Sequence, residues 1–281
     1  MSDAAARLVL EAGGRRWEVD LSRGESLAIQ MGGDGPLPAF FVPGRLHQET
    51  LAVGGFTGDT RAGGSCNVSR LDLVPHCHGT HTEGIGHVTD QRAAVQQLFD
   101  GRPGLAWLAT VSAAPAGDSG DAYHCALADS EPLVTQKALS AALADCPAAV
   151  TALVLRVRPL DAPLPVRDFN ADPGYPLLSA EATTWLSGQA YDHLLIEMPS
   201  LDRAEDGGRL GNHRAWWGLP PAGRDMDQAR HPRRAITEMI HVPDALDDGL
   251  YWLQPGLSPL HGDATPSRPL LYPLRPLDEN A

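Results

Sequence analysis

The most informative segment of the chain is His76-Cys77-His78-Gly79-Thr80-His81-Thr82-Glu83-Gly84-Ile85-Gly86-His87. It holds four of the 11 histidines of this 281-residue chain, together with one cysteine and one glutamate. Imidazole, thiolate and carboxylate groups are the ligands of borderline metals such as zinc. A polar strand lined by histidines is the plainer interpretation, but so many ligand-type side chains in so short a segment favour a metal site.

The spacing of these residues indicates which of them converge. Successive side chains of an extended strand point to opposite faces, so residues at even intervals share a face. Four candidates lie at even intervals and are predicted to share one face: Cys77, His81, Glu83 and His87. His76 and His78 would then face the other way. The alternative, in which His76 or His78 replaces Cys77 as a ligand, needs a twist or bulge that turns the chain by one residue.

The composition excludes several classes of function. Hydrophobic residues make up 43% of the chain and charged residues 20%, which is ordinary for a soluble protein with a sizeable core. The formal net charge is −13 and Lys137 is the only lysine, which argues against binding to nucleic acid. The sequence contains no apolar run of the roughly 20 residues that a membrane helix needs, and its first residues lack an export signal. We therefore expect a cytoplasmic protein that acts on a small molecule and contacts neither nucleic acid nor membrane.

Strand-like and helix-like segments alternate along the chain. A hairpin is predicted around Gly13-Gly14 in residues 7–21, and further strands at 39–42, 66–74, 105–111, 149–157 and 193–198. Helices are predicted at 91–99, 133–144 and 179–186. The proline-rich tail after Pro255 is expected to wrap the surface. This alternation predicts a single α/β domain over residues 1–281, whose mixed β-sheet is flanked by the helices at 133–144 and 179–186.

Residues 77–87 resemble the metal-binding signature of the cyclase-like hydrolases, the family that contains bacterial kynurenine formamidase and isatin hydrolase. That signature reads His-x-Gly-Thr-His-x-Asp-x-Pro-x-His. Aligned on Gly79-Thr80-His81, the chain matches the last histidine with His87, and it departs from the signature at Cys77, Glu83 and Ile85. The resemblance implies the swivelling β/α/β fold of that family, in which helices flank a mixed sheet.

The resemblance continues downstream. Residues 195–202, Leu-Ile-Glu-Met-Pro-Ser-Leu-Asp, look like a strand of that family that ends in a Pro-Ser-x-Asp turn. It leads to His213 and Glu238, which match later ligands of the family and would complete a metal shell with the residues at 77, 81 and 83. The segment from Pro220 to Pro232 looks inserted. Because the shell would include the sulfur of Cys77, zinc is expected, with manganese possible but less favoured, and with one or two ions per subunit.

The resemblance also implies a function. It suggests a hydrolase in which a metal-activated water cleaves a C–N or lactone bond of a small aromatic molecule, with His87 as general acid and base. The alternative is a metal-stabilised binding or structural protein that kept the site and lost turnover. Trp216 and Trp217, or more weakly Phe56, are candidates to stack against the substrate. Members of the family form dimers, and the tryptophan pair with the inserted segment is expected to offer an apolar surface for a homodimer.

Overall fold

The computed structural model describes residues 7–33, 38–42, 46–158, 164–171 and 174–277. The main architectural feature of this part of the chain is an 11-stranded sheet. In chain order its strands are β1 (Leu8–Ala12), β2 (Arg15–Val19), β3 (Glu25–Ser26), β8 (His81–Gly84), β9 (Gly104–Ser112), β12 (Ala152–Arg158), β14 (His193–Ile196), β15 (Ala235–Glu238), β16 (Gly249–Gln254), β17 (Ala264–Pro266) and β18 (Leu270–Pro276).

The sheet is mixed, as the sequence predicted. Its order is β1-β2-β18-β16-β9-β12-β14-β15-β8-β17, and β3 pairs with β18. The four central strands β9, β12, β14 and β15 run parallel, whereas β16 on one side and β8 on the other run antiparallel to their neighbours. Parallel strands need crossover connections, and these connections carry most of the helices of the fold. The α/β class is therefore confirmed.

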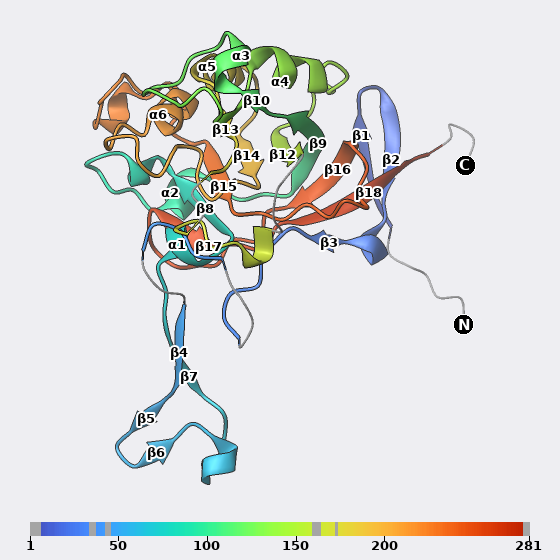
Figure 1. The fold of residues 1–281 in the computed structure, drawn as a ribbon. Coiled ribbons are helices and arrows are strands. Elements are labelled where there is room, and N and C mark those ends of the chain that lie inside the picture. The colour runs from blue at the N-terminus through green and yellow to red at the C-terminus, as the bar shows by residue number, and fades with distance from the viewer. Residues whose placement is uncertain (1–6, 34–37, 43–45, 159–163, 172–173, 278–281) are drawn as a thin grey trace.

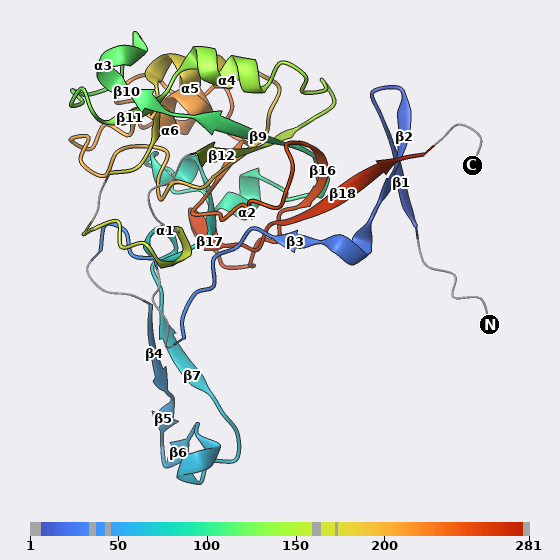
Figure 2. The ribbon, with the colours of Figure 1, turned by 45° about the vertical axis from the view of Figure 1, so that its right-hand side comes forward.

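Helices α3 (Ala116–Ser119), α4 (Gln136–Ala142), α5 (Ala180–Ser187) and α6 (Gly211–Trp217) gather over one face of the sheet (Figures 1 and 2). The other helices of the described residues are α1 (Pro75–His78) and α2 (Val95–Leu98), and α2 packs through Val95 against Ala235 on the opposite face. The 3-10 turns outside residues 47–72 are η1 (Leu21–Arg23), η3 (Ile85–His87), η4 (Leu164–Val166) and η5 (Met226–Gln228). A small second sheet, β10 (Ala114–Pro115), β11 (Pro132–Val134) and β13 (Leu177–Leu178), lies beside α3 to α6. In the described residues, no helix has both the length and the apolar character that crossing a membrane requires.

The helix predictions differ in outcome for local reasons. Ser179 accepts a hydrogen bond from the backbone of Ala182, so α5 begins next to its predicted start. The helix predicted at 133–144 starts later, because its first residues belong to strand β11 and Thr135 is the N-cap. Within the segment 91–99, where a helix was predicted, only the residues of α2 are α-helical. Arg92 has a φ of 47°, which no right-handed helix accommodates.

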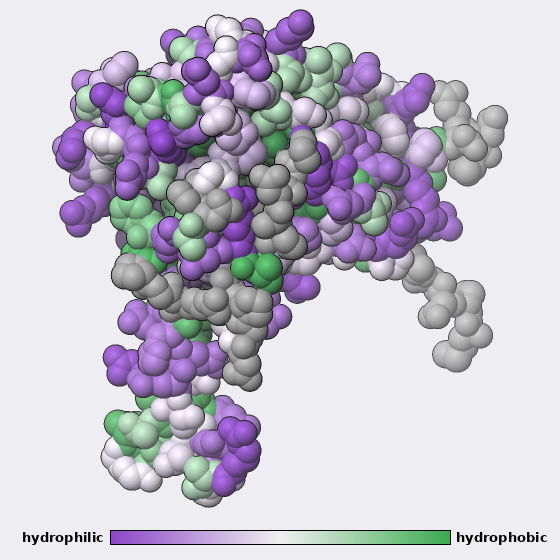
Figure 3. Space-filling model, in the orientation of Figure 1, coloured by the Kyte–Doolittle hydropathy of each residue, from purple (hydrophilic) through white to green (hydrophobic). Residues whose placement is uncertain are grey.

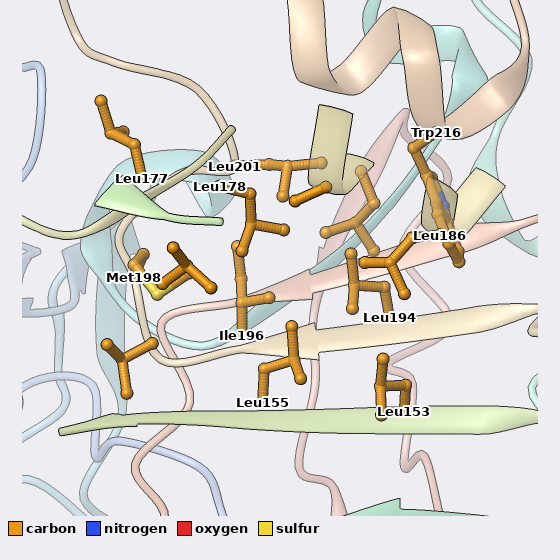
Figure 4. Close-up of a cluster of buried hydrophobic side chains, with 14 of the residues drawn as sticks. Leu153, Leu155, Leu177, Leu178, Leu186, Leu194, Ile196, Met198, Leu201 and Trp216 are labelled. Carbon is orange, nitrogen blue, oxygen red and sulfur yellow. The ribbon is translucent and has the colours of Figure 1, made fainter. Parts of the chain in front are cut away.

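Alternation along β12 divides the hydrophobic core between the two faces of the sheet. Leu153, Leu155 and Val157 point to the helical side, where they pack in the larger cluster shown in Figure 4. Ala152 and Val154 belong to a second cluster on the opposite face. Burying a leucine completely contributes about 1.5–3 kcal/mol. Both faces of β12 are therefore covered, as is usual for a strand within a parallel sheet.

Two segments lie elsewhere than expected. The tail after Pro255 does not wrap the surface: its strands β17 and β18 enter the central sheet beside β8 and β16. Residues 47–72 leave the body as a protruding arm (Figures 1 and 2), which holds β4 (His47–Thr50), β5 (Ala52–Val53), β6 (Phe56–Thr57), η2 (Thr60–Ala62) and β7 (Ser69–Asp72). β4 pairs with β7, and every residue of these two strands is exposed.

Candidate metal centre

Strand β8 carries two of the predicted ligands. His81 and Glu83 are two residues apart, so they share a face of the strand, and both are fully buried. The antiparallel register with β15 sets Glu238 opposite His81. As a result, the Nε2 atom of His81 lies 3.4 Å from a carboxylate oxygen of Glu238. The structure thus brings together three of the side chains that the sequence selected.

The segment before β8 follows a different geometry from the one expected. Pro75 begins a single helical turn, α1, which breaks the strand alternation. His76 therefore faces the site, with its Nδ1 atom 3.0 Å from Oε2 of Glu83. Among the described residues, Cys77 belongs to no cluster of three or more side chains able to hold a metal, whereas His76 belongs to two such clusters. The geometry thus brings His76 to Glu83 and leaves Cys77 outside the clusters, which is the arrangement of the alternative and not the one expected from strand alternation.

Cys77 has a different environment. Its side chain is buried, and burial raises the pKa of the thiol, although a backbone hydrogen bond from Val42 opposes that rise. A neutral thiol is a poor metal ligand, because the thiolate is the form that binds. His78 is also turned away, since its Nδ1 accepts a hydrogen bond of 3.0 Å from the backbone N–H of Val74. The donors that face the centre are consequently nitrogen and oxygen atoms only.

His213 lies on α6, far along the chain from β8. Its Nε2 atom is 3.0 Å from Oε1 of Glu83 and 3.3 Å from Oε1 of Glu238. Its Nδ1 atom donates a hydrogen bond of 2.8 Å to Asp202, which also accepts the backbone N–H of His213. Because Asp202 holds the hydrogen on Nδ1, Nε2 is the nitrogen that faces the two glutamates and whose lone pair a metal ion would use once its proton is released. Histidine ligands of metals commonly have such a carboxylate behind them.

The Gly-Thr-His core explains how His81 is held. Gly79 has a φ of 151°, a conformation that favours glycine. Its carbonyl accepts the hydrogen on Nδ1 of His81 at 2.9 Å, so Nε2 of His81 also keeps its lone pair. The hydroxyl of Thr80 donates to the carbonyl of Met239 and accepts the N–H of Ile29 at 2.8 Å. Thr80 therefore joins the start of β8 to the residue after Glu238 and holds His81 and Glu238 side by side.

The buried charges of the site favour a cation. Burial alone raises the pKa of the Glu83 carboxyl, but the imidazoles of His87 and His213 hold that pKa well below its usual range. Burial also lowers the pKa of His213, yet Glu83, Asp202 and Glu238 together raise it well above its usual value. Burial and the charge of Glu83 raise the pKa of Glu238, but His213 and His81 lower it overall. Glu83 and Glu238 are thus both kept ionised. Metals and protons compete for the same histidine nitrogens, so such a site binds a metal by releasing protons.

Unsatisfied atoms test whether a metal fits. Nε2 of His81 and both carboxylate oxygens of Glu83 are buried, and no described group makes a hydrogen bond of good geometry to them. Such atoms are costly to bury without a partner. They are all directed into one cluster, and their chemistry is that of zinc and manganese ligands. The residues present therefore fit a divalent metal ion.

His87 lies at the edge of this centre on η3. Its Nε2 atom is 4.0 Å from Oε2 of Glu83, and its Nδ1 atom is 3.2 Å from Oδ2 of Asp263. The same oxygen of Asp263 lies 3.0 Å from Nε2 of His76. These contacts hold the pKa of Asp263 below its usual range. Asp263 was not among the predicted site residues, since it lies in the proline-rich tail with no ligand-type pattern around it, and the pairing of β17 with β8 brings it to the site.

A family comparison places the chain among known proteins. Residues 19–203 match the family model Cyclase, described as "Putative cyclase". The chain belongs to the Cyclase family. The matched region contains the segment 76–87 and Asp202, whereas His213, Glu238 and Asp263 lie beyond it. No curated protein sequence matches this chain.

Solved structures share the fold of this Cyclase-family chain. Isatin hydrolase A from Labrenzia aggregata superposes with a TM-score of 0.56 at 16% identity, covering 89% of this chain and 93% of that one. Isatin hydrolase A from Ralstonia solanacearum gives 0.55 at 17% identity, covering 89% and 91%. A structure described as a predicted metal-dependent hydrolase from Bacillus stearothermophilus gives 0.54 at 16% identity, covering 89% and 98%. At these identities the similarity establishes the fold.

The aromatic candidates of this Cyclase-family chain do not line a substrate wall. Trp216 and Trp217 are completely buried. The indole N–H of Trp217 donates to the carbonyl of Arg234, whose guanidinium lies 4.8 Å from the ring of Trp216. The expectation that the pair forms an apolar dimer surface is therefore wrong, because both rings fill the core beneath α6. Phe56 lies on the arm, away from the metal centre (Figure 1).

Proposed function

We propose that this protein is a metal-dependent hydrolase that cleaves a C–N bond, in a formamide, amide or cyclic imide, or a lactone bond of a small, aromatic molecule. The observation that carries the proposal is the cluster of buried, unsatisfied nitrogen and oxygen atoms around Glu83. Family membership supports it, as does the fold shared with isatin hydrolases and with a predicted metal-dependent hydrolase.

The proposed ligands are His76, His81, Glu83, His213 and Glu238. The two oxygens of Glu83 face different partners, Oε2 towards His76 and Oε1 towards His213, so the set has room for one or two ions per subunit. Without the sulfur of Cys77, the argument against manganese disappears. Nitrogen and oxygen donors suit both Zn²⁺ and Mn²⁺. We propose that zinc is the resident ion and that manganese can replace it.

The chemistry divides between the ion and the residues beside it. A bound divalent ion supplies a Lewis acid for the substrate carbonyl and lowers the pKa of water next to it. Because Asp263 accepts the hydrogen on Nδ1 of His87, the lone pair on Nε2 of His87 faces the site. In our proposal this nitrogen takes a proton from the attacking water and returns it to the leaving nitrogen or oxygen as the C–N or C–O bond breaks. Such a group typically contributes about 10²–10⁴-fold in rate.

A hollow beside His87 supports catalysis over a purely structural metal. It has a volume of about 690 Å³, and both His87 and Asp263 line it. Structural metal sites are closed by four protein ligands, whereas catalytic sites keep a position open for water or substrate. An accessible hollow at the proposed general base is what a hydrolase needs, and a structural site has no use for it.

Metal analysis combined with a substrate screen tests the proposal. We expect the purified protein to contain zinc or manganese and to hydrolyse members of a panel of formanilides, cyclic imides and aryl lactones. Chelation should abolish turnover, and the added metal should restore it. Glu238→Gln should lose both metal and turnover, whereas Glu11→Gln, at an exposed position of β1, should keep both. Turnover that survives complete metal removal would refute the proposal.

The assembly and location are also proposed. We propose that the whole chain, residues 1–281, acts as one cytoplasmic domain that associates as a homodimer or higher homo-oligomer. The support for association is the arm, because an isolated two-stranded ribbon is marginally stable in water. The arm exposes apolar side chains, including Val53 at 63% and Leu71 at 55%. A second copy of the chain would cover them.

A further inference from the structure

Arginine side chains line the hollow beside His87 in an otherwise acidic protein. The chain carries a formal net charge of −13, yet the walls of this hollow include Arg92, Arg214 and Arg224. They come from three separate segments: the loop before α2, the helix α6 and the loop after it. A second hollow of about 780 Å³ adjoins the first and shares Arg214 and Arg224 with it. The positive charge is thus concentrated where a substrate would enter.

Arg214 is the fixed element of this arrangement. It follows His213 directly, and only 7% of its surface is exposed. Its Nε atom donates to the carbonyl of Arg209 at 2.9 Å, and its Nη1 atom donates to the carbonyls of Gly223 and Val88. These carbonyls orient the guanidinium but do not neutralise its charge. Within the described residues, Nη2 of Arg214 has no hydrogen-bond partner, so one edge of the planar group remains available to a ligand.

Arg92 and Arg224 add positive charge next to Arg214, which favours the binding of an anion. Arg224 and Arg214 line the same two hollows, and two guanidinium groups of like charge there favour an anion between them. Arg224 has one exposed acidic partner, Asp90, at 3.9 Å, and such surface pairs contribute little. Arg92 makes no ion pair or side-chain hydrogen bond with any residue that the structure describes. The remaining acidic side chain of the hollow, Asp263, is engaged by His76 and His87.

From this arrangement we infer that the hollow binds a carboxylate group of the substrate, held by Arg92, Arg214 and Arg224 while the scissile bond lies at His87. The inference rests on the proposed function, and it narrows the substrate class to small amides or lactones that carry an acid group apart from the bond being cleaved. Guanidinium groups bind carboxylates through paired N–H donors. A neutral aromatic amide would leave these three charges uncompensated.

Binding measurements on the metal-loaded protein test the inference without requiring turnover. Benzoate and benzamide are matched probes that differ in charge, and their affinities are compared by titration calorimetry at low ionic strength, where screening is weak. We expect benzoate to bind at least about tenfold more tightly than benzamide. The double variant Arg92→Ala/Arg224→Ala should lose that preference. Arg102→Ala is the control, because Arg102 is exposed, pairs with Asp100 and lies outside both hollows.

Further arms separate other sources of binding. Arg214→Lys keeps the charge but loses the planar fork, and it should weaken benzoate binding while metal content stays unchanged. If benzoate keeps its preference in the double variant, the carboxylate binds elsewhere, for instance at the metal, and the inference is overturned. Equal affinities of benzoate and inorganic phosphate, or no binding of either aromatic probe, would also overturn it. None of these results depends on hydrolysis, so the proposed function can fail or stand separately.

Discussion

Glu83 sits at the centre of the site because each of its oxygens faces a different histidine. Oε1 lies 3.0 Å from His213, and Oε2 lies 3.0 Å from His76. An aspartate at this position would be one methylene shorter, so its two oxygens could not reach both His213 and His76. In our proposal, Glu83 and His76 depart from the family signature together, since the helical turn of α1 places His76 within reach of the longer carboxylate.

The first prediction separates His76 from Cys77. His76→Ala should lower metal content and turnover together, because it removes a ring nitrogen directed at Glu83. Cys77→Ser should keep the metal, because the thiol is buried and neutral outside the cluster. Its cost is expected in stability alone, at about 1–3 kcal/mol for a buried polar replacement. Metal analysis and urea unfolding of both variants check this. Metal loss in Cys77→Ser with full retention in His76→Ala would contradict it.

The second prediction concerns the orientation of His87. Asp263→Asn keeps the size of the side chain but can present its NH₂ group to His87, which favours the wrong tautomer. We expect kcat to fall by about 10–100-fold, as for other partners behind a functional histidine, with KM little changed. Asp263→Glu should recover part of the rate. Steady-state kinetics with metal analysis measures this, and a variant that lost its metal would show that Asp263 acts as a ligand instead.

At the scale of elements, the sequence predicted what depends on local alternation. The shared face of His81 and Glu83, the hairpin of β1 and β2, and helix α5 all follow from periodicity and capping. The sequence did not predict that His76 faces the site, because the helical turn begun by Pro75 interrupts the strand pattern. It also failed at Asp263, where the pairing of two strands far apart in sequence brings the side chain to the site. Such long-range pairing leaves no mark in the residues near 263.

The third prediction concerns η3, the turn that carries His87. A Cβ built at Gly86 would lie 2.1 Å from the carbonyl oxygen of Ala93, so the turn must move to accept any side chain. Gly86→Ala should therefore displace His87, cost about 1–3 kcal/mol and lower kcat. Gly188→Ala is a matched control, because Gly188 has a φ of −76° and its Cβ would meet nothing closer than 3.3 Å. Equal effects of the two variants on kcat would contradict this role for Gly86.

At the scale of the whole molecule, a buried histidine links stability to pH. His193 lies at the start of β14, its Nε2 atom 2.6 Å from the hydroxyl of Thr237, and burial lowers its pKa to about 3. The unfolded chain binds a proton near its ordinary pKa of about 6.5, whereas the folded chain does not until about pH 3. Stability is therefore fully present above the unfolded pKa and is lost as the pH falls through this window.

The fourth prediction follows from this loss of stability at low pH. The free energy of unfolding should fall by up to about 1.4 kcal/mol per pH unit below pH 6 through His193 alone. His193→Gln removes this contribution, so its unfolding free energy should depend less steeply on pH than that of the wild-type protein. Urea unfolding in the presence of EDTA measures both, and comparing the two proteins cancels the titration of the metal-site histidines. Parallel pH profiles would show that His193 is not the group responsible.

The arm exposes apolar side chains that a monomer would leave in contact with solvent. Figure 3 shows apolar side chains exposed among polar ones along its length.

The pairing of β4 with β7 begins at the base of the arm, where His47 lies opposite Asp72, so a short turn can join the two strands there. In the fifth prediction, replacing residues 49–70 by Asn-Gly, a favoured two-residue turn, leaves the sheet and the metal centre folded but removes the surface that joins two copies. We expect the full chain to sediment as a dimer at micromolar concentration and the shortened chain as a monomer with unchanged metal content. A shortened chain that still sediments as a dimer would place the subunit interface elsewhere on the body.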